Sequence, residues 1–205
     1  MPSAWSSSLT RRVLDVMMAS GLLLLVLPLL LALALTIIVD SPGNPIFCQQ
    51  RIGYRGRRFA MLKLRTMVPD AESRLAALRA DAALSGPVFK MANDPRVTRV
   101  GRWLRRFSLD ELPQLVNVVL GDMSLIGPRP LPPDQVSGDD PRFAQRCWVL
   151  PGMTGWWQVQ GRAMHVDYDR WLGLDCEYVL RASATLDAAI LARTLPAIWR
   201  GDGAC

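Results

Sequence analysis

Residues 16–39 read VMMASGLLLLVLPLLLALALTIIV and contain no charged side chain. A helix rises about 1.5 Å per residue, so this run could just cross a membrane hydrocarbon core of about 30 Å. It is longer than the apolar part of a cleavable signal peptide, and no small-residue cleavage site follows it. The run by itself therefore predicts a membrane anchor, of which a single transmembrane span is the commonest kind.

Two features of the run favour a different topology. Pro28 lies at its centre, where it removes one helix hydrogen bond and clashes with the preceding turn. Arg11 and Arg12 precede the run. A basic group follows it: Arg51, Arg55, Arg57, Arg58, Lys63 and Arg65. Basic flanks stay on the cytoplasmic side, and a spanning helix cannot keep both of them there. We therefore predict for residues 1–40 a re-entrant helix hairpin, bent at Pro28, that enters and leaves by one face; a single span is the alternative.

The composition sets the class of protein and of partner. The chain has 205 residues, which fits one domain better than two. Lys and Arg exceed Asp and Glu by 6, and this balance favours anionic partners: nucleic acid, phosphorylated small molecules or an acidic membrane surface. The four cysteines are scattered and there is one histidine, which argues against a zinc site and a disulfide framework. We expect reduced thiols.

The rest of the chain predicts a mostly helical α+β domain over residues 41–205. Residues 46–67 alternate short apolar and basic stretches around two glycines, which indicates extended segments or a hairpin. Two segments rich in Gly with Pro or Trp predict loops: 121–133 and 150–162. Apolar spacing and composition predict helices over four ranges: 70–84, 97–107, 112–120 and 166–199.

Two adjacent carboxylates stand out in RFSLDELPQL (106–115). Ser108 and Glu111 form an S-x-x-E capping box, which would place Asp110 and Glu111 in a first helical turn. Alternatively, Pro113 is the first helical residue and the pair lies just outside the helix. Chemistry is a further possibility, because carboxylates beside a basic cluster suit Mg²⁺ and a diphosphate, and an ionised Asp is a competent nucleophile at phosphorus.

Several basic and polar residues are candidates for phosphate or substrate binding. Arg129 lies between two prolines in GPRP, which limit the loop backbone and suit bidentate phosphate binding; a solvated loop arginine is the alternative. Lys63 and Arg65 in KLRTM would share one face of a strand and contact either substrate or membrane headgroups. The remaining candidates are Arg106, Gln158 and Arg162.

Together these segments resemble the bacterial sugar transferase family. The resemblance is carried by FKMANDPRVTRVGRWLRRFSLDELPQLVNVVLGDMSLIGPRP (89–130), LPGMTGWWQVQGR (150–162), FCQQRIG (47–53) and KLRTM (63–67). It covers nearly the whole chain, and a match of several spaced blocks is highly specific. The members that it resembles are the small monotopic phosphoglycosyl transferases, which begin polysaccharide and glycoprotein glycan assembly.

The resemblance implies a reaction. A sugar-1-phosphate would pass from a UDP-sugar to undecaprenyl phosphate, and UMP would be released. The family's Asp-Glu dyad falls on Asp110 and Glu111. Asp110 would attack the β-phosphorus to form an aspartyl phosphosugar and would carry Mg²⁺ together with the diphosphate. Glu111 would deprotonate or orient the lipid phosphate, and the family's Pro-Arg-Pro falls on Pro128, Arg129 and Pro130.

The resemblance also implies a location. Residues 1–40 would lie in the inner leaflet of the bacterial inner membrane, and residues 41–205 would form a catalytic domain at its cytoplasmic face, the two working as one unit. The family often has Ser-Pro at the helix break, whereas Leu27 precedes Pro28 here, which leaves the bend angle open. No nucleic-acid partner is expected, and homo-oligomerisation is left open.

Two alternatives differ in class. One is a membrane-tethered basic binding protein without catalysis. The other is a polytopic phosphoglycosyl transferase, which needs many membrane spans, whereas this chain has one apolar run. The sequence names neither the sugar nor the glycan pathway.

Overall fold

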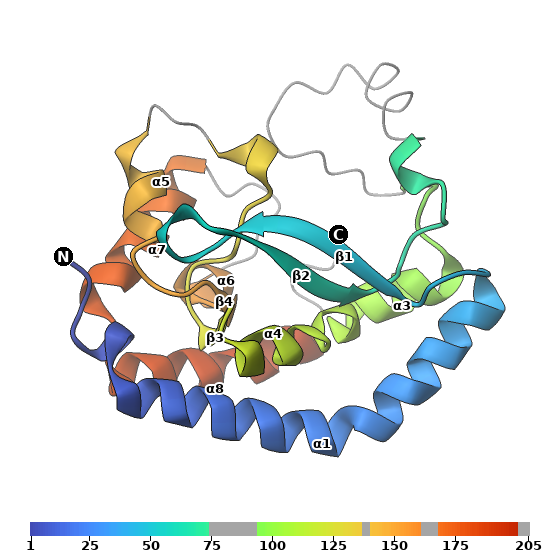
Figure 1. Ribbon diagram of the computed structural model, residues 1–205, viewed down its shortest axis with the longest axis horizontal. Helices are drawn as coiled ribbons and strands as arrows, with labels where there is room; N and C mark the ends of the chain where they lie inside the picture. The colour runs from blue at the N-terminus through green and yellow to red at the C-terminus, as the bar shows by residue number, and fades with distance from the viewer. Residues whose placement is uncertain (74–93, 137–139, 161–167, 201–205) are drawn as a thin grey trace.

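The computed structural model describes residues 1–73, 94–136, 140–160 and 168–200. Its longest element is helix α1 (Leu9–Asp40), which continues through Pro28. Within the described ranges, α1 is the one helix long and apolar enough to cross a membrane. Figure 1 shows α1 in blue along the lower edge of the molecule, curving so that its second half rises at the right.

The first turns of α1 are fixed to the domain by a buried polar network. The Arg11 guanidinium donates to the Asp187 carboxylate at 3.1 Å and to the Tyr178 hydroxyl at 2.8 Å. It also donates at 3.0 Å to Ser124 Oγ, which donates in turn to the Asp15 carboxylate at 2.7 Å. All five side chains are buried. A buried network of this kind fixes an orientation, because a shift of the helix would leave its partners unpaired.

The last turns of α1 contact the same domain through apolar side chains. Leu33 and Ile37 are buried against Leu64 and Leu104. Between the two attachments, the face of α1 that points away from the domain is apolar and exposed: Leu22, Leu24, Leu25, Leu27, Leu29, Leu31, Leu35 and Ile38. The first and last turns of α1 therefore both contact one domain. The outer face of α1 is mostly apolar, and the exposed Thr36 hydroxyl donates back to the Ala32 carbonyl.

A β-hairpin lies above α1 in Figure 1. Strands β1 (Ile46–Ile52) and β2 (Arg58–Leu64) are antiparallel, as predicted, and are joined through the 3₁₀ turn η2 (Tyr54–Gly56). Side chains alternate along a strand, so Phe59 and Met61 point to the core and Lys63 lies on the same face. The hairpin therefore directs the Lys63 side chain toward the interior of the domain.

Helix α4 (Gln114–Leu120) covers the free edge of β2. Asn117 of this helix is buried, accepts a hydrogen bond from the Leu62 amide at 3.0 Å and donates one to the Ala60 carbonyl at 2.8 Å. An uncovered strand edge would invite pairing with other chains. One amide side chain thus satisfies the edge and fixes α4 to the hairpin.

Helix α3 (Arg99–Arg106) and the 3₁₀ turn η3 (Leu109–Glu111) precede α4. The chain breaks between α3 and η3 at Ser108, which has a φ of 53°. The predicted capping box is wrong, because Ser108 in this left-handed conformation makes no side-chain capping bond. The other alternative is close to the structure: the two acids lie outside α4, and Pro113 is its N-cap.

The C-terminal half is helical around a minimal parallel sheet of β3 (Ser124–Ile126) and β4 (Gly152–Thr154). The prediction of pure loops at 121–133 and 150–162 is wrong, because they contain β3, β4 and α6. Strands of three residues are too short to show alternation in a sequence. The remaining elements are η1 (Trp5–Ser7), η4 (Pro133–Gln135), α5 (Pro141–Arg146), α6 (Trp156–Gln160), α7 (Tyr168–Arg181) and α8 (Ala184–Arg200).

In the described residues the fold is mostly helical with two small sheets. The mostly helical α+β class was predicted, whereas the sheet of β3 and β4 was not. Helices occur within or across the predicted ranges 97–107, 112–120 and 166–199. Most of the helix predicted over 70–84 lies outside the described residues, since the description stops at residue 73.

The buried network at the start of α1 predicts unequal effects for two neighbouring arginines. Arg11→Met would leave the Asp187 carboxylate buried without its cation, which costs about 3–5 kcal/mol. Arg12 is half-buried and donates to the carbonyls of Val119 and Met123, so Arg12→Met should cost about 1 kcal/mol. Thermal unfolding in detergent micelles would measure both. Equal destabilisation would contradict the role given to the network.

Candidate active site

The two adjacent acids occupy η3, the short turn between α3 and α4. Asp110 is buried, and Glu111 is mostly buried. The turn is set by the left-handed Ser108, whose carbonyl accepts from the Glu111 amide at 3.2 Å, and by Pro113 at the start of α4. The side chains therefore project from a fixed 3₁₀ turn and not from a regular helix.

Glu111 is held by two cations from distant parts of the chain. Its Oε1 accepts from Lys63 Nζ at 3.2 Å and from Arg129 Nη2 at 2.7 Å. Burial would raise the pKa of Glu111, but the charges of Arg129 and Lys63 outweigh it and hold the pKa well below its usual range. Glu111 is therefore a fixed anion with its proton affinity suppressed.

Asp110 has the opposite environment. Its carboxylate lies 4.0 Å from Lys63 Nζ, and within the described ranges no hydrogen bond joins it to another side chain. Burial raises the pKa of Asp110, and the charge of Lys63 offsets this only in part. Neighbouring carboxylates with pKa values shifted in opposite directions are typical of catalytic pairs with divided roles.

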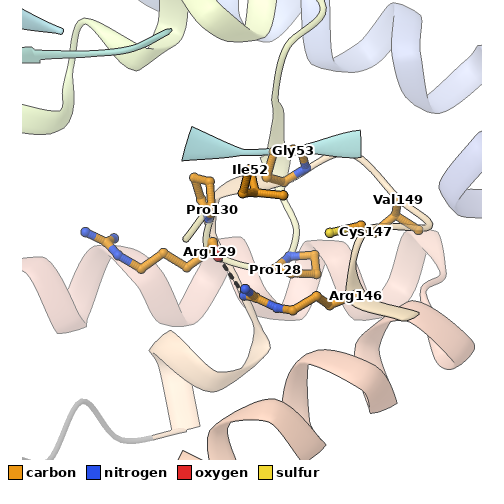
Figure 2. A pocket seen from close by; sticks show the side chains of 9 residues that line it. Ile52, Gly53, Pro128, Arg129, Pro130, Arg146, Cys147 and Val149 are labelled. Atoms are coloured by element: carbon orange, nitrogen blue, oxygen red, sulfur yellow. Dashed lines mark hydrogen bonds between the residues drawn. The ribbon is translucent and has the colours of Figure 1, made fainter. Parts of the chain in front are cut away.

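The Pro-Arg-Pro turn at 128–130 follows β3 and brings Arg129 to the acids. Figure 2 shows the Arg129 side chain leaving the turn on the side away from Arg146, while its carbonyl faces Arg146. A cavity of about 10 Å³ lies behind the turn, lined among others by Ile52, Gly53 and Cys147. That volume is at the lower limit for one water molecule, so this cavity is too small to hold a substrate.

A model of the family described as bacterial sugar transferase matches residues 6–201. The chain belongs to the bacterial sugar transferase family. It is 39% identical over 203 residues to the undecaprenyl-phosphate galactose phosphotransferase of Salmonella typhimurium. This match covers 97% of the chain and 42% of the relative. The chain is 42% identical over 206 residues to the UDP-glucose:undecaprenyl-phosphate glucose-1-phosphate transferase of Caulobacter vibrioides, covering 96% and 72%.

A shorter relative matches along most of its own length. The exopolysaccharide production protein ExoY of Rhizobium meliloti is 36% identical over 209 residues, covering 95% of this chain and 88% of the relative. The chain spans about two fifths of the length of several longer relatives, for example 42% of the Salmonella protein.

Two further cations lie near the acids and were not among the site residues predicted from the sequence. Arg51 donates to the Pro130 carbonyl at 3.0 Å, and burial together with the charge of Arg129 lowers the pKa of Arg51 to about 10. Arg105 donates to Thr66 Oγ1 at 2.9 Å, and its charge lowers the pKa of Asp110 against the effect of burial. Together with Lys63 and Arg129, they leave an excess of positive charge around the acids. The hairpin register could have identified Arg51, which lies on the same face as Lys63.

The structure does not bring every candidate to this cluster. Arg65 donates instead to the carbonyls of Ser41 and Pro42, just after α1. Arg106 is exposed, with its guanidinium 5.7 Å from the ring centroid of Phe107. Gln158 is buried in α6 and donates to the Met153 carbonyl at 3.2 Å. Arg162 lies outside the described residues.

The donor set at the acids fits a hard divalent cation held together with phosphate oxygens. The described ranges hold no cluster of three or more metal-ligating side chains, so no closed all-protein site is formed there. Asp110 offers one carboxylate without a hydrogen-bond partner among the described residues. One carboxylate combined with phosphate oxygens is how Mg²⁺ is commonly held in phosphoryl-transfer sites.

The opposite pKa shifts predict opposite effects on stability. In the presence of chelator at pH 7.5, Asp110→Asn should raise Tm, because the amide removes the penalty of a buried ionised carboxylate. This gain should shrink as pH falls and vanish below about pH 4, where Asp110 is protonated in the folded and unfolded states alike. We expect a change of about 2–4 °C, the size produced by ~1 kcal/mol in a domain of this length.

Glu111→Gln should lower Tm at pH 7.5. The low folded pKa of Glu111 contributes stability that is present above about pH 4.3 and is lost as pH falls further, so the difference from wild type should narrow in acid. Differential scanning fluorimetry of both variants from pH 3.5 to 8 would measure this. An Asp110→Asn protein that melts below wild type at every pH would contradict the assignment.

Proposed function

We propose that this chain transfers a sugar-1-phosphate from a UDP-sugar to undecaprenyl phosphate and releases UMP, as the first membrane step of a glycan or exopolysaccharide pathway. The named activities of the Salmonella and Caulobacter relatives support undecaprenyl phosphate as the acceptor, and that of the Caulobacter relative supports a UDP-sugar as the donor. The observation that carries the proposal is the contrast between the two acids. Asp110 is buried and has no hydrogen bond from the described residues, whereas the neighbouring Glu111 is fixed by two cations. A binding protein has no need for that arrangement.

In the first half of the proposed reaction, a carboxylate oxygen of Asp110 attacks the β-phosphorus of the UDP-sugar. The bond between that phosphorus and the bridging oxygen breaks, and UMP leaves with the electron pair. An aspartyl phosphosugar remains on the enzyme. A carboxylate that is buried and lacks hydrogen-bond partners among the described residues is less stabilised than one in water, and this makes it more nucleophilic once it is ionised.

In the second half, an oxygen of undecaprenyl phosphate attacks the same phosphorus. The bond to Asp110 breaks, and the carboxylate is restored with its electron pair. Lys63, Arg129, Arg51 and Arg105 neutralise phosphate charge in both halves, since phosphoryl transfer is mostly positioning and electrostatics. Glu111, with its pKa well below the usual range, is a poor base, so we assign it the role of orienting Lys63 and Arg129.

Asp110 together with the diphosphate oxygens would hold Mg²⁺. The ion would supply further neutralisation of the diphosphate when bound. The protein's own share is to present one carboxylate with no competing hydrogen bond from the described part of the chain.

We also propose that α1 is re-entrant and places the domain at the cytoplasmic face of the inner membrane. Both ends of α1 contact one domain: Arg11 bonds to it at the start, and Leu33 and Ile37 pack against it near the end. A straight span would separate these attachments by the thickness of a bilayer. The exposed apolar face between them then lies in one leaflet, and the missing helix bond at Pro28 is tolerated where the helix curves.

The chemistry is tested by the first half-reaction alone. Purified protein with a UDP-sugar and no lipid should release about one UMP per active site and then stop, and intact mass should increase by one phosphosugar. Asp110→Asn should abolish burst and adduct together, whereas Glu111→Gln should slow both and leave some adduct. A folded Asp110→Asn protein with near-normal turnover would refute the nucleophile, and a wild type inactive on a panel of UDP-sugars would favour the binding protein.

The metal is tested by chelation. EDTA should abolish UMP release, and Mg²⁺ or Mn²⁺ added in excess should restore it, because the diphosphate charge is otherwise incompletely neutralised. Full activity in chelator would remove the metal from the mechanism.

The topology is tested by cysteine labelling in a background without the native cysteines. Ser7→Cys and Asn44→Cys place exposed thiols on the two flanks of α1. Neither should react with an impermeant maleimide added from the periplasmic side, and both should react after the inner membrane is opened. Pro28→Leu should straighten α1 and expose one of the two sites in part of the population. If only one of the two sites is labelled from the periplasm in the protein that retains Pro28, α1 is a transmembrane span instead.

A further inference from the structure

A second buried ion pair lies directly behind the Pro-Arg-Pro turn. Arg146 at the end of α5 donates to the Asp175 carboxylate of α7 at 2.5 Å, and their side chains are 5% and 1% exposed. The Arg146 guanidinium also lies 5.4 Å from the ring centroid of Trp171. Neither residue touches Glu111 or Asp110 in any contact among the described residues, so the pair does not belong to the charge cluster itself.

Stability alone does not account for this pair. Burial raises the pKa of Asp175 to about 6 in spite of the charge of Arg146. Asp175 Oδ1 and Arg146 Nε have no hydrogen-bond partner in the described part of the chain. A buried ion pair with unsatisfied atoms is commonly no better for folding than well-packed apolar side chains. Another contact must therefore explain what Arg146 does.

That contact is with the backbone of the active-site arginine. Arg146 Nη2 donates to the carbonyl of Arg129 at 2.6 Å, drawn as the dashed line in Figure 2. From the hairpin, Arg51 donates to the next carbonyl, that of Pro130, at 3.0 Å. Pro128 and Pro130 have no N–H to offer, so this turn is fixed through its carbonyl oxygens: the Gly152 amide donates to that of Pro128 at 3.0 Å, and the two arginine side chains donate to the next two.

We propose that Arg146, oriented by Asp175, is a positioning residue for Arg129. It fixes the main chain of the turn, and the turn sets how far the Arg129 side chain reaches toward Glu111 and the substrate diphosphate. The inference rests on the proposed function for its phosphate ligand. Charge-assisted hydrogen bonds are about twice as strong as neutral ones, and a misplacement of about 1 Å at a phosphate-binding group costs a large share of the rate.

The chain contains a matched control. Arg142, on the same helix α5, donates to Asp169 of α7 at 2.5 Å, so it joins the same two helices as Arg146 does. Among the described contacts, Arg142 makes no hydrogen bond to the Pro-Arg-Pro turn. Asp169 is 72% exposed and Asp175 is 1% exposed, so the control asks whether the loss of any ion pair between α5 and α7 slows the reaction, and thermal unfolding accounts for the difference in burial.

The test is a double-mutant cycle with Arg129. Arg146→Met alone would leave Asp175 buried without a cation, so the variant to use is R146M/D175L, which removes both charges and keeps the volume. It is combined with Arg129→Ala, which keeps the carbonyl but removes the guanidinium. The control pair is R142M/D169L. Thermal unfolding checks the fold of each protein, and R146K serves as a charge-conserving variant in the same cycle if R146M/D175L melts early.

The readouts are the rate of the UMP burst and the affinity for UDP in titration calorimetry. In the protein that keeps Arg129, R146M/D175L should slow the UMP burst at least 10-fold and weaken UDP binding. In the Arg129→Ala background, it should change the burst rate and the UDP affinity by less than 2-fold each. The control pair should change both by less than 2-fold in either background. Equal losses with and without the Arg129 side chain, or no loss at all, would overturn the proposal.

The two readouts separate this inference from the proposed function. A wild-type protein that binds UDP and shows no burst would contradict the reaction, and the coupling would then be decided by UDP affinity alone. A normal wild-type burst with purely additive losses would leave the reaction standing and refute the positioning role.

Discussion

The buried carboxylate of Glu111 joins three stretches of chain that are far apart in sequence. Lys63 comes from β2, Arg129 from the turn after β3, and Glu111 from η3. Glu111 and Lys63 are mostly buried and Arg129 is partly exposed, so the loss of one charge would leave the others incompletely compensated. These ion pairs also determine the surroundings of Asp110. Because Lys63 and Arg129 bind Glu111, Asp110 is buried close to a cation without a hydrogen bond from the described residues. Its electrostatic environment follows from that division.

Strand β3, which precedes the turn that carries Arg129, connects the candidate site to α1. Arg11 and Asp15 of α1 bond to β3 through Ser124, and Arg11 also donates to the Ile126 carbonyl. Arg129 follows only three residues after Ile126. The helix proposed to enter the lipid is thus bonded to the strand that presents the phosphate-binding arginine. This gives a physical reason for a lipid-phosphate acceptor to arrive at a fixed height relative to Asp110, as the proposed second half-reaction requires.

The sequence predicted what depends on periodicity and local chemistry. The apolar helix, the hairpin at 46–64 and the helices at 99–106 and 168–200 follow from patterns that extend over several turns or pairs. Strands β3 and β4 were missed because three residues carry no period, and the left-handed Ser108 was missed because its conformation is imposed by packing around η3. In the candidate site, Asp110, Glu111, Arg129 and Lys63 were predicted and meet. Arg51 and Arg105 were not, because their reach depends on strand register and helix rotation, whereas Arg65 is diverted to carbonyls beside α1.

The central claim is that the phosphosugar is transferred twice, first from UDP to Asp110 and then from Asp110 to the lipid phosphate. The stereochemical course at the transferred phosphorus tests this most directly. A UDP-sugar made chiral at its β-phosphorus with sulfur and oxygen isotopes would be converted to the lipid product, and the configuration of the product would be determined by ³¹P NMR. Two in-line displacements each invert the centre, so the account predicts net retention. Net inversion would mean direct transfer from UDP-sugar to lipid and would contradict the aspartyl intermediate.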